Sequence, residues 1–129
     1  VRQRPGKPMA VGVLDGRPVL GLPGNPVSAA VCFEVYGRPL LAAMLGRAGA
    51  DRAEPAVLAA PFPKAAGLHT FARATAARDA DGRVALSPAG AQDSHVARSL
   101  AASDGLVHLP AGWTDAPAGA AVRFERWAW

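Results

Sequence analysis

The sequence predicts an α/β unit followed by an all-β unit, and three observations lead to this fold class. An apolar strand changes into an apolar helix within residues 21–29. Residues 49–55 are polar and rich in chain breakers, as is typical of a linker. Beyond them the apolar residues form short runs separated by Pro, Gly or Asp-Gly, a pattern that favours a small barrel or sandwich. We therefore expect an α/β unit over residues 1–48 and an all-β unit over residues 56–129.

The composition predicts a packed domain. Half of the 129 residues are apolar, which disfavours disorder, and no apolar run approaches the roughly 20 residues of a membrane helix. We therefore expect no membrane partner. Cys32 is the only cysteine, so it cannot form an internal disulfide; it fits a reducing cytoplasm, and we expect it to be buried. The chain opens on Val1 inside a polar run, and we expect it to be a piece of a longer protein.

The net charge of +4 lies entirely in the first unit. Residues 1–48 contain six cations and two anions, whereas residues 49–129 contain eight of each. This asymmetry favours an anionic small molecule near the strand-to-helix switch over nucleic acid, which would also need basic and aromatic residues interleaved on the second unit. A solvated basic face explains the same charges equally well, so charge alone leaves both interpretations open.

The first elements predict a hairpin that follows a basic turn. Arg4-Pro5-Gly6-Lys7-Pro8 reads as a rigid turn in which Gly6 lets the backbone approach a ligand. Its arginine offers a planar fork for phosphate oxygens and its lysine a mobile point charge. Residues 9–14 and 17–22 then read as two strands, with Asp15-Gly16 as the hairpin turn between them.

The next residues predict a turn that leads into a capped helix. Pro23 and Gly24 suit a type II turn, in which Gly24 takes a positive φ. Asn25 is a good N-cap, and Pro26 suits the first helical position because its missing N–H is not needed there.

The start of this helix is a candidate anion site. We expect the backbone N–H groups of residues 27–29 to point outward beside the Ser28 hydroxyl, at the positive end of the helix dipole. A plain strand-to-helix connection with good capping explains the same residues, and this alternative stays open.

The helix itself is apolar all round from Pro26 to Leu45, so we expect it to be covered on more than one side. Pro39 should kink or split it at Gly37-Arg38, and Gly46 should end it. Such a helix needs a partner sheet larger than one hairpin, which again indicates a longer chain.

The second unit contains five predicted strands and one short helix. The expected strands are residues 56–62, 69–78, 83–87, 106–109 and 120–127, the helix is 96–102, and Asp81-Gly82 is a hairpin tip.

Conventional catalytic patterns are absent. His69, His95 and His108 lack metal-ligand spacing, and the adjacent side chains of Ser94 and His95 should point apart. No acidic pair is convincing as a Mg²⁺ site.

Several motifs together resemble the C-terminal part of the molybdopterin molybdenumtransferases, the MoeA family that includes the catalytic domain of gephyrin. The resemblance covers essentially the whole chain, and its most specific part is the Pro-Gly-Asn-Pro motif after a Pro-Gly-Lys-Pro turn. The motifs are residues 4–8, 21–29, 33–34, 38–39, 92–95 and 102–106.

The resemblance implies an elongated multidomain homodimer that takes adenylylated molybdopterin and molybdate, uses Mg²⁺, and yields molybdenum cofactor with release of AMP. It implies that residues 1–48 are the C-terminal piece of a three-layer, MogA-like α/β domain and that residues 56–129 are a small β-barrel domain. Contact with the molybdopterin adenylyltransferase is expected on the same ground.

The resemblance also implies a set of substrate-binding residues. Arg4 stands where many members have Lys, and Asp93 replaces the glycine usual before Ser94. The implied substrate-binding residues are Arg4, Lys7, Pro23, Gly24, Asn25, Pro26, Ser28 and Ser94.

The acids that the family uses for molybdate and Mg²⁺ would lie before Val1. We therefore expect the parent to be an enzyme and this chain alone to be inactive. Two other classes stay open: a scaffold or peptide-binding module of the gephyrin type, and a basic barrel that binds nucleic acid.

Overall fold

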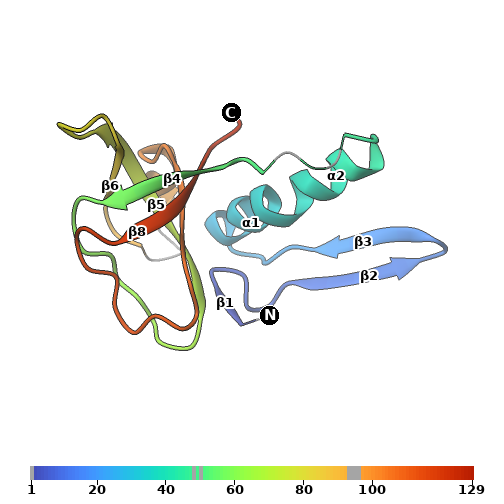
Figure 1. Cartoon of the computed structure of the whole chain (residues 1–129). Coiled ribbons are helices and arrows are strands. Elements are labelled where there is room, and N and C mark those ends of the chain that lie inside the picture. Colours follow the sequence, from blue (N-terminus) through green and yellow to red (C-terminus); the bar gives the residue numbers. More distant parts are fainter. Residues whose placement is uncertain (1, 48, 50, 93–96) are drawn as a thin grey trace.

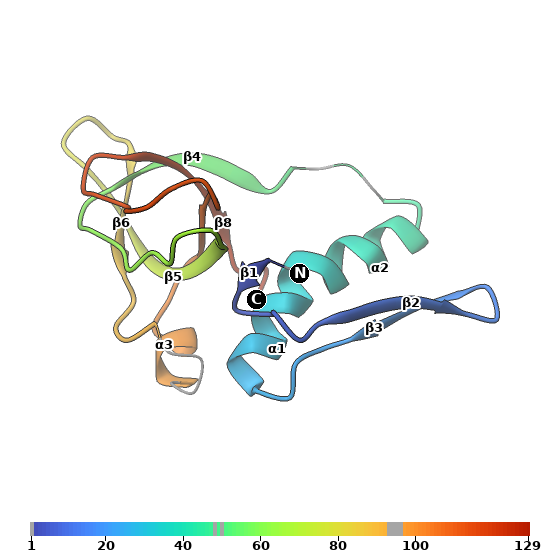
Figure 2. The ribbon, with the colours of Figure 1, turned by 90° about the horizontal axis from the view of Figure 1, so that it is seen from below.

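The computed structural model describes residues 2–47, 49, 51–92 and 97–129. Figure 1 shows a hairpin and a helix running side by side away from a rounded group of strands. Figure 2, the same ribbon seen from below, shows the short strand β1 between the helix and those strands.

The second unit is a small closed β-barrel of five strands among the described residues, so the prediction of a barrel is confirmed. The ten-residue strand β5 closes it, because residues 74–78 pair with β6 while residues 70–74 pair with β7. The remaining order is β6-β4-β8-β7, so every barrel strand has two neighbours. The barrel strands are β4 (Ala53–Leu58), β5 (His69–Arg78), β6 (Val84–Pro88), β7 (Gly105–Leu109) and β8 (Ala121–Arg126).

Alternation along these strands fills the barrel interior with apolar side chains. On β8, for example, Val122 and Phe124 are buried while their neighbours face outward. Phe124 is fully buried and packs with residues from the other four barrel strands. The core cluster comprises Ala56, Leu58, Phe62, Ala72, Ala74, Val84, Leu86, Val107, Leu109, Ala116, Val122 and Phe124.

The predicted hairpin is confirmed as β2 (Ala10–Leu14) and β3 (Arg17–Gly21). Asp15 and Gly16 both have positive φ, 49° and 72°, as a two-residue hairpin turn requires. Both faces are open in the described structure, and Val13, for instance, is 75% exposed.

The helix runs without interruption as α1 (Pro26–Cys32), a π-helical segment η1 (Phe33–Gly37) and α2 (Arg38–Met44). Pro39 was predicted to kink or split the helix at Gly37-Arg38, and the boundary between η1 and α2 lies there. The helix does not break, because the π-helical segment accommodates Pro39. A Cβ on Gly37 would lie 2.6 Å from Phe33 Cδ2, so a larger residue there would force the Phe33 ring to shift.

The expectation that the helix is covered on more than one side is not met by the described residues. The helix α1 buries Val27, Ser28, Val31 and Cys32, but α2 buries none of its residues. The run Pro26–Met44 has 19 residues and a mean hydropathy of 1.2, so among the described residues one helix is long and apolar enough to span a membrane by length and composition. Helices in the cores of soluble proteins pass the same test, so this is weak evidence.

Two short elements complete the fold. The strand β1 (Gln3–Arg4) was not predicted, and it pairs in parallel with the start of β5. The helix α3 (Ala97–Ala101) lies within the predicted range 96–102. The strand β4 begins at Ala53, inside the predicted linker 49–55, and the division into domains stays a prediction.

The joint between helix and barrel is held by Arg52. Its guanidinium lies 3.4 Å from the buried carboxylate of Glu34 on η1 and 3.2 Å from that of Glu125 on β8. It also donates to the carbonyl oxygen of Arg126 at 3.0 Å. Glu34 is paired in addition with Arg38 at 2.7 Å. One linker side chain therefore connects both units.

Candidate functional site

A cleft of about 770 Å³ lies between the N-terminal turn, the start of α1 and the barrel. The structure brings six predicted site residues together on its lining, whereas Pro26, the first residue of α1, is not on the lining and Ser94 lies outside the described residues. The six are Arg4, Lys7, Pro23, Gly24, Asn25 and Ser28.

The basic turn depends on Gly6 for its packing within the protein, whereas the predicted approach of its backbone to a ligand stays a prediction. Gly6 has φ of 109°, a conformation that favours glycine, and its carbonyl oxygen accepts a hydrogen bond from the Met9 N–H at 3.0 Å. A Cβ at this position would lie within 2.5 Å of Cys32 Sγ and closer still to Gln3 Nε2. The turn therefore rests directly on two buried side chains.

Gln3 connects this turn to the helix. Its side chain is buried, and Nε2 donates to the Pro5 carbonyl oxygen at 3.1 Å and contacts Cys32 Sγ at 4.0 Å. Its Oε1 accepts a hydrogen bond from the hydroxyl of Tyr36 on η1. Burial raises the pKa of the Cys32 thiol, as expected for a small buried hydrophobe rather than a reactive cysteine. Burial also raises the pKa of Tyr36, and the nearby Cys32 thiol raises it further by a smaller electrostatic effect. The Tyr36 hydroxyl therefore stays protonated and can donate to Gln3.

The start of α1 corrects one prediction about the anion site. Asn25 is the N-cap as predicted, but its Oδ1 accepts hydrogen bonds from the N–H groups of Val27 at 3.0 Å and Ser28 at 3.2 Å. The Ala29 N–H donates to the Asn25 carbonyl oxygen at 2.8 Å. These amides are already used by the cap, so they do not point outward toward a ligand.

The predicted type II turn at Pro23-Gly24 is also wrong. Gly24 is not among the residues with positive φ, and a Cβ on it would meet nothing within 4 Å. The chain instead approaches α1 in an extended cap conformation, with Asn25 at φ −72° and ψ 125°.

The barrel contributes a wall of the cleft that sequence reasoning missed. Lys64, on the loop between β4 and β5, lies on the lining, and its ammonium donates to the carbonyl oxygens of Ala65 and Leu68, each at 2.6 Å. Thr70 and Gln92 lie on the same wall. No local pattern singled out Lys64, because it stands in an unpatterned Pro- and Ala-rich loop.

Gln92 is fixed to the barrel through the backbone of Arg73. Its Oε1 accepts from the Arg73 N–H at 2.9 Å, and its Nε2 donates to the Arg73 carbonyl oxygen at 3.0 Å. The Arg73 guanidinium, itself buried, donates to Ser99 Oγ at 2.7 Å and to the Ala91 carbonyl oxygen at 3.1 Å. Residues 91 and 92 are thus held at the edge of the cleft.

The described lining of the cleft is electropositive. Arg4, Lys7 and Lys64 lie on it, and no described lining residue is a carboxylate. Mg²⁺ prefers carboxylate and other oxygen ligands. The described residues also contain no group of three or more His, Cys, Asp or Glu side chains that could hold a metal ion. The described residues of this cleft therefore fit an anion and do not fit Mg²⁺.

The histidines His69 and His108 lie with Phe71 in an aromatic cluster rather than at a metal site. The ring centroids of His69 and Phe71 are 4.6 Å apart, and those of His69 and His108 are 5.9 Å apart. Burial, followed by the charges of His108 and Lys64, lowers the pKa of His69. His95 lies outside the described residues.

Comparison with known proteins identifies relatives of the whole chain. Residues 55–127 match the family model described as the MoeA C-terminal region, domain IV. Molybdopterin molybdenumtransferase 2 of Mycobacterium tuberculosis is 38% identical over 120 residues, which are 92% of this chain and 29% of that protein. The molybdopterin molybdenumtransferase of Haemophilus influenzae is 32% identical over 124 residues, 95% of this chain and 31% of that protein.

Solved structures of molybdenum cofactor biosynthesis proteins have the same fold as this chain. A molybdopterin biosynthesis MoeA protein from Pyrococcus horikosii matches 99% of this chain and 31% of its own, with a TM-score of 0.73 and 28% identity. A molybdenum cofactor biosynthesis protein from Pyrococcus furiosus matches the fold with a TM-score of 0.71 at 24% identity, over 98% of this chain and 43% of its own. The chain thus spans about three tenths of the length of the curated relatives it matches.

Proposed function

This chain belongs to the family of the MoeA C-terminal region, and we propose that it is the C-terminal part of a molybdopterin molybdenumtransferase. The parent enzyme takes adenylylated molybdopterin and molybdate, and it yields molybdenum cofactor with release of AMP. The role of this chain is to hold the anionic part of the pterin substrate in the cleft between the basic turn and the barrel.

The observation that carries this proposal is the convergence of Arg4 and Lys7 with the start of α1 on one cleft. Its volume, about 770 Å³, lies within the range of small-molecule sites. An arginine fork and a lysine ammonium are the side chains that suit phosphate oxygens. Because the amides at the start of α1 serve the Asn25 cap, the cations are the groups that would contact the phosphate.

The wider architecture belongs to the same proposal. Residues 1–48 would be the last part of a three-layer, MogA-like α/β domain in a homodimer. The exposed apolar side chains of β2 and α2, such as Val13 and Met44, support a larger sheet covering this side. Contact with the molybdopterin adenylyltransferase and a cytoplasmic location complete the proposal, and the free, buried Cys32 suits a reducing compartment.

Residues 1–129 alone should not insert molybdenum. The described cleft lining contains no carboxylate to hold Mg²⁺, so we assign the metal and the handling of molybdate to parts of the parent outside this chain. Molybdenum insertion by the purified 129-residue chain would contradict this assignment.

The charges of the barrel favour this proposal over binding of nucleic acid. Three arginines on or beside the barrel strands are ion-paired: Arg83 pairs with Asp79 at 2.9 Å, and Arg126 pairs with Glu54 at 2.8 Å. Arg123 pairs with Asp51. A surface that binds phosphates along a strand needs cations that are not already neutralised.

The experiment is a calorimetric titration of the chain with a pterin phosphate mimic. We expect the double variant Arg4→Ala, Lys7→Ala to abolish measurable binding. The control Arg17→Ala, Arg47→Ala removes the same charge from exposed positions that do not line the cleft, and it should bind as the wild type does. Equal loss in both variants would indicate a general charge effect, and the proposed site would then be wrong.

A further inference from the structure

We propose that Gln3 is a positioning residue of the cleft. Its buried amide holds the basic turn in one place on the helix, and the hydroxyl of Tyr36 acts through that amide. Tyr36 is not among the described residues that line the cleft, so the proposal adds a residue of the helix to those that determine the site. It rests on the proposed function, in which Arg4 and Lys7 of this turn bind the phosphate.

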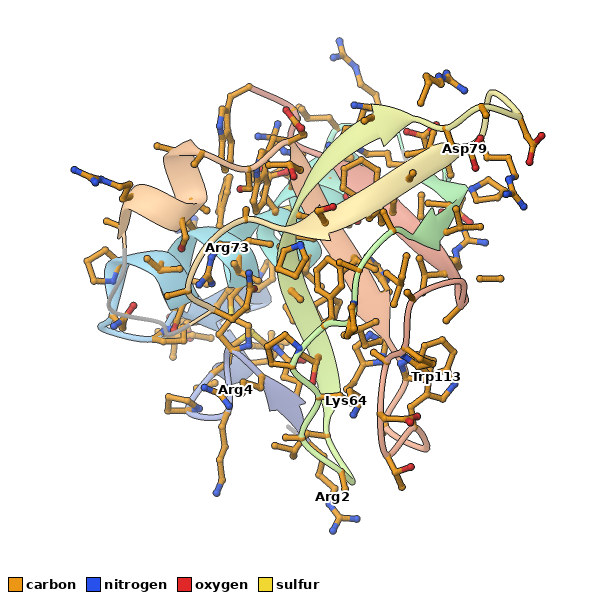
Figure 3. All side chains as sticks on the ribbon, turned by 90° about the vertical axis from the view of Figure 1, so that its left-hand side faces the viewer. Arg2, Arg4, Lys64, Arg73, Asp79 and Trp113 are labelled. Atoms are coloured by element: carbon orange, nitrogen blue, oxygen red, sulfur yellow. The ribbon has the colours of Figure 1, made fainter. Side chains whose placement is uncertain are left out.

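Buried residues and cations alternate along the turn. Gln3 and Gly6 are buried, whereas the residue that follows each of them, Arg4 or Lys7, is exposed. The Met9 N–H closes the turn by donating to the Gly6 carbonyl oxygen at 3.0 Å. Figure 3 shows Arg4 on this segment beside the barrel. Because each cation directly follows a buried residue, a displacement of the buried residues moves both cations.

The polar partners of Gln3 fix the direction in which its amide faces. The Pro5 carbonyl oxygen, which can only accept, takes a hydrogen bond from Nε2 at 3.1 Å, and Cys32 Sγ lies 4.0 Å from the same nitrogen. The Tyr36 hydroxyl donates to Oε1. A reversed amide would bring Oε1 against the Pro5 carbonyl oxygen, so that two acceptors would face each other. Tyr36 therefore keeps the amide donor directed at the basic turn.

The backbone of Gln3 is fixed separately, by the barrel. The strand β1 pairs in parallel with β5, with Gln3 opposite His69, and the His69 N–H donates to the Arg2 carbonyl oxygen at 3.1 Å. Gln3 thus contacts the turn, the helix and the barrel, the three parts between which the cleft lies.

Packing alone is the competing explanation, because any side chain of suitable length could fill the space under the turn. Methionine is similar to glutamine in length and adapts to irregular spaces, but it has no amide. If packing alone matters, Gln3→Met should leave the turn in place. If the amide positions the turn, the loss of its hydrogen bonds should release the turn locally, and Tyr36→Phe, which removes only a hydroxyl, should act in the same direction.

The test measures hydrogen exchange of the Met9 amide by NMR in the full 129-residue chain. The internal control is the Phe62 amide, which donates to the Ala116 carbonyl oxygen at 2.9 Å within the barrel unit. We expect Gln3→Met to accelerate exchange at Met9 about tenfold and Tyr36→Phe about fivefold, with a change of less than about twofold at Phe62. Both variants should also weaken the binding of inorganic phosphate, by about threefold or more.

The variant Gln3→Glu tests the amide donor itself. A protonated carboxyl group keeps a donor for Pro5 and an acceptor for Tyr36, whereas the ionised carboxylate has acceptors only. After correction for the intrinsic exchange rate, protection of the Met9 amide should fall between about pH 5 and about pH 8 in Gln3→Glu but not in Gln3→Met.

The other outcomes separate this inference from the proposed function. Unchanged exchange at Met9 in Gln3→Met and Tyr36→Phe overturns the inference, while phosphate binding by the wild type still supports the proposed site. Equal acceleration at Met9 and Phe62 overturns it too, since the effect would then be a loss of global stability. Faster exchange at Met9 alone with unchanged phosphate affinity reduces Gln3 to a structural residue and overturns its positioning role.

The wild-type titration tests the proposed function itself. Absence of phosphate binding by a wild-type chain with a cooperative thermal transition overturns the proposed anion site, and the positioning role with it. Faster exchange at Met9 together with weaker phosphate binding supports both.

Discussion

Replacement of Gly6 by alanine tests how tightly the basic turn is held. At φ of 109° an alanine is strained, at a cost of about 1–2 kcal/mol. The added Cβ also enters space occupied by Cys32 Sγ and Gln3 Nε2, and overpacking of this kind costs about 1–3 kcal/mol. The Gln3 amide cannot swing away without breaking its bonds to Pro5 and Tyr36. We therefore expect Gly6→Ala to lower the free energy of unfolding by about 3 kcal/mol.

The assay is urea unfolding followed by circular dichroism, with Gly12→Ala as the matched control. Gly12 lies on β2 without a positive φ, and a Cβ on it meets nothing within 4 Å. Its replacement should change stability by no more than about 0.5 kcal/mol. If Gly6→Ala is as stable as Gly12→Ala, the turn is not seated on Gln3 and Cys32 as described.

A double-mutant cycle separates the two contributions. In a Cys32→Ala background the new methyl group no longer meets the sulfur atom, while the backbone strain at Gly6 is unchanged. The cost of Gly6→Ala should therefore fall by about 1 kcal/mol or more in that background. An unchanged cost would assign the effect to the backbone and to the contact with Gln3, and would refute the packing argument for Cys32.

Three further changes follow from other contacts. Asn25→Ala removes the acceptor for two amides of α1 and should cost about 1 kcal/mol in urea unfolding; no loss would mean that the cap is dispensable. Arg52→Met removes the link between Glu34 and Glu125 and should cost about 1 kcal/mol, with less effect at 1 M salt than at 0.1 M. The lowered pKa of His69 means that the unfolded chain binds its proton more readily, so stability should fall as the pH drops below about 6.5. His69→Gln should reduce the difference in the free energy of unfolding between pH 7.5 and pH 5.5. If that difference is unchanged, titratable groups other than His69 cause it.

The barrel could be predicted because its signals are local. Strand β5 has the predicted bounds, residues 69–78, and the Asp81-Gly82 tip follows it with Gly82 at a positive φ of 78°. The hairpin β2–β3 was equally clear from Asp15-Gly16 and the runs on either side. Turn chemistry and short apolar runs are set by neighbouring residues, so they remain visible without the tertiary structure.

The errors concern features that distant residues decide. The strand β1 has two residues and exists only because β5 lies beside it, so it has no periodicity of its own. Lys64 joins the cleft because the barrel brings its loop to the basic turn. The start of α1 is a local exception: an Asn N-cap accepts hydrogen bonds from the N2 and N3 amides, so the predicted cap already implied that Val27 and Ser28 are engaged.

The parallel pairing of β1 with β5 also constrains the order of folding. The register Gln3↔His69 joins segments that are far apart in the chain, and a contact of this kind has a high loop-closure entropy cost. The β2–β3 hairpin and the barrel hairpin β5–β6 can form from neighbouring residues, whereas the β1–β5 ladder must wait until both ends of the chain segment between them are in place. We therefore expect the cleft between the N-terminal turn and the barrel to assemble late, and the His69 amide, which donates to Arg2, is a position at which hydrogen exchange can test this order.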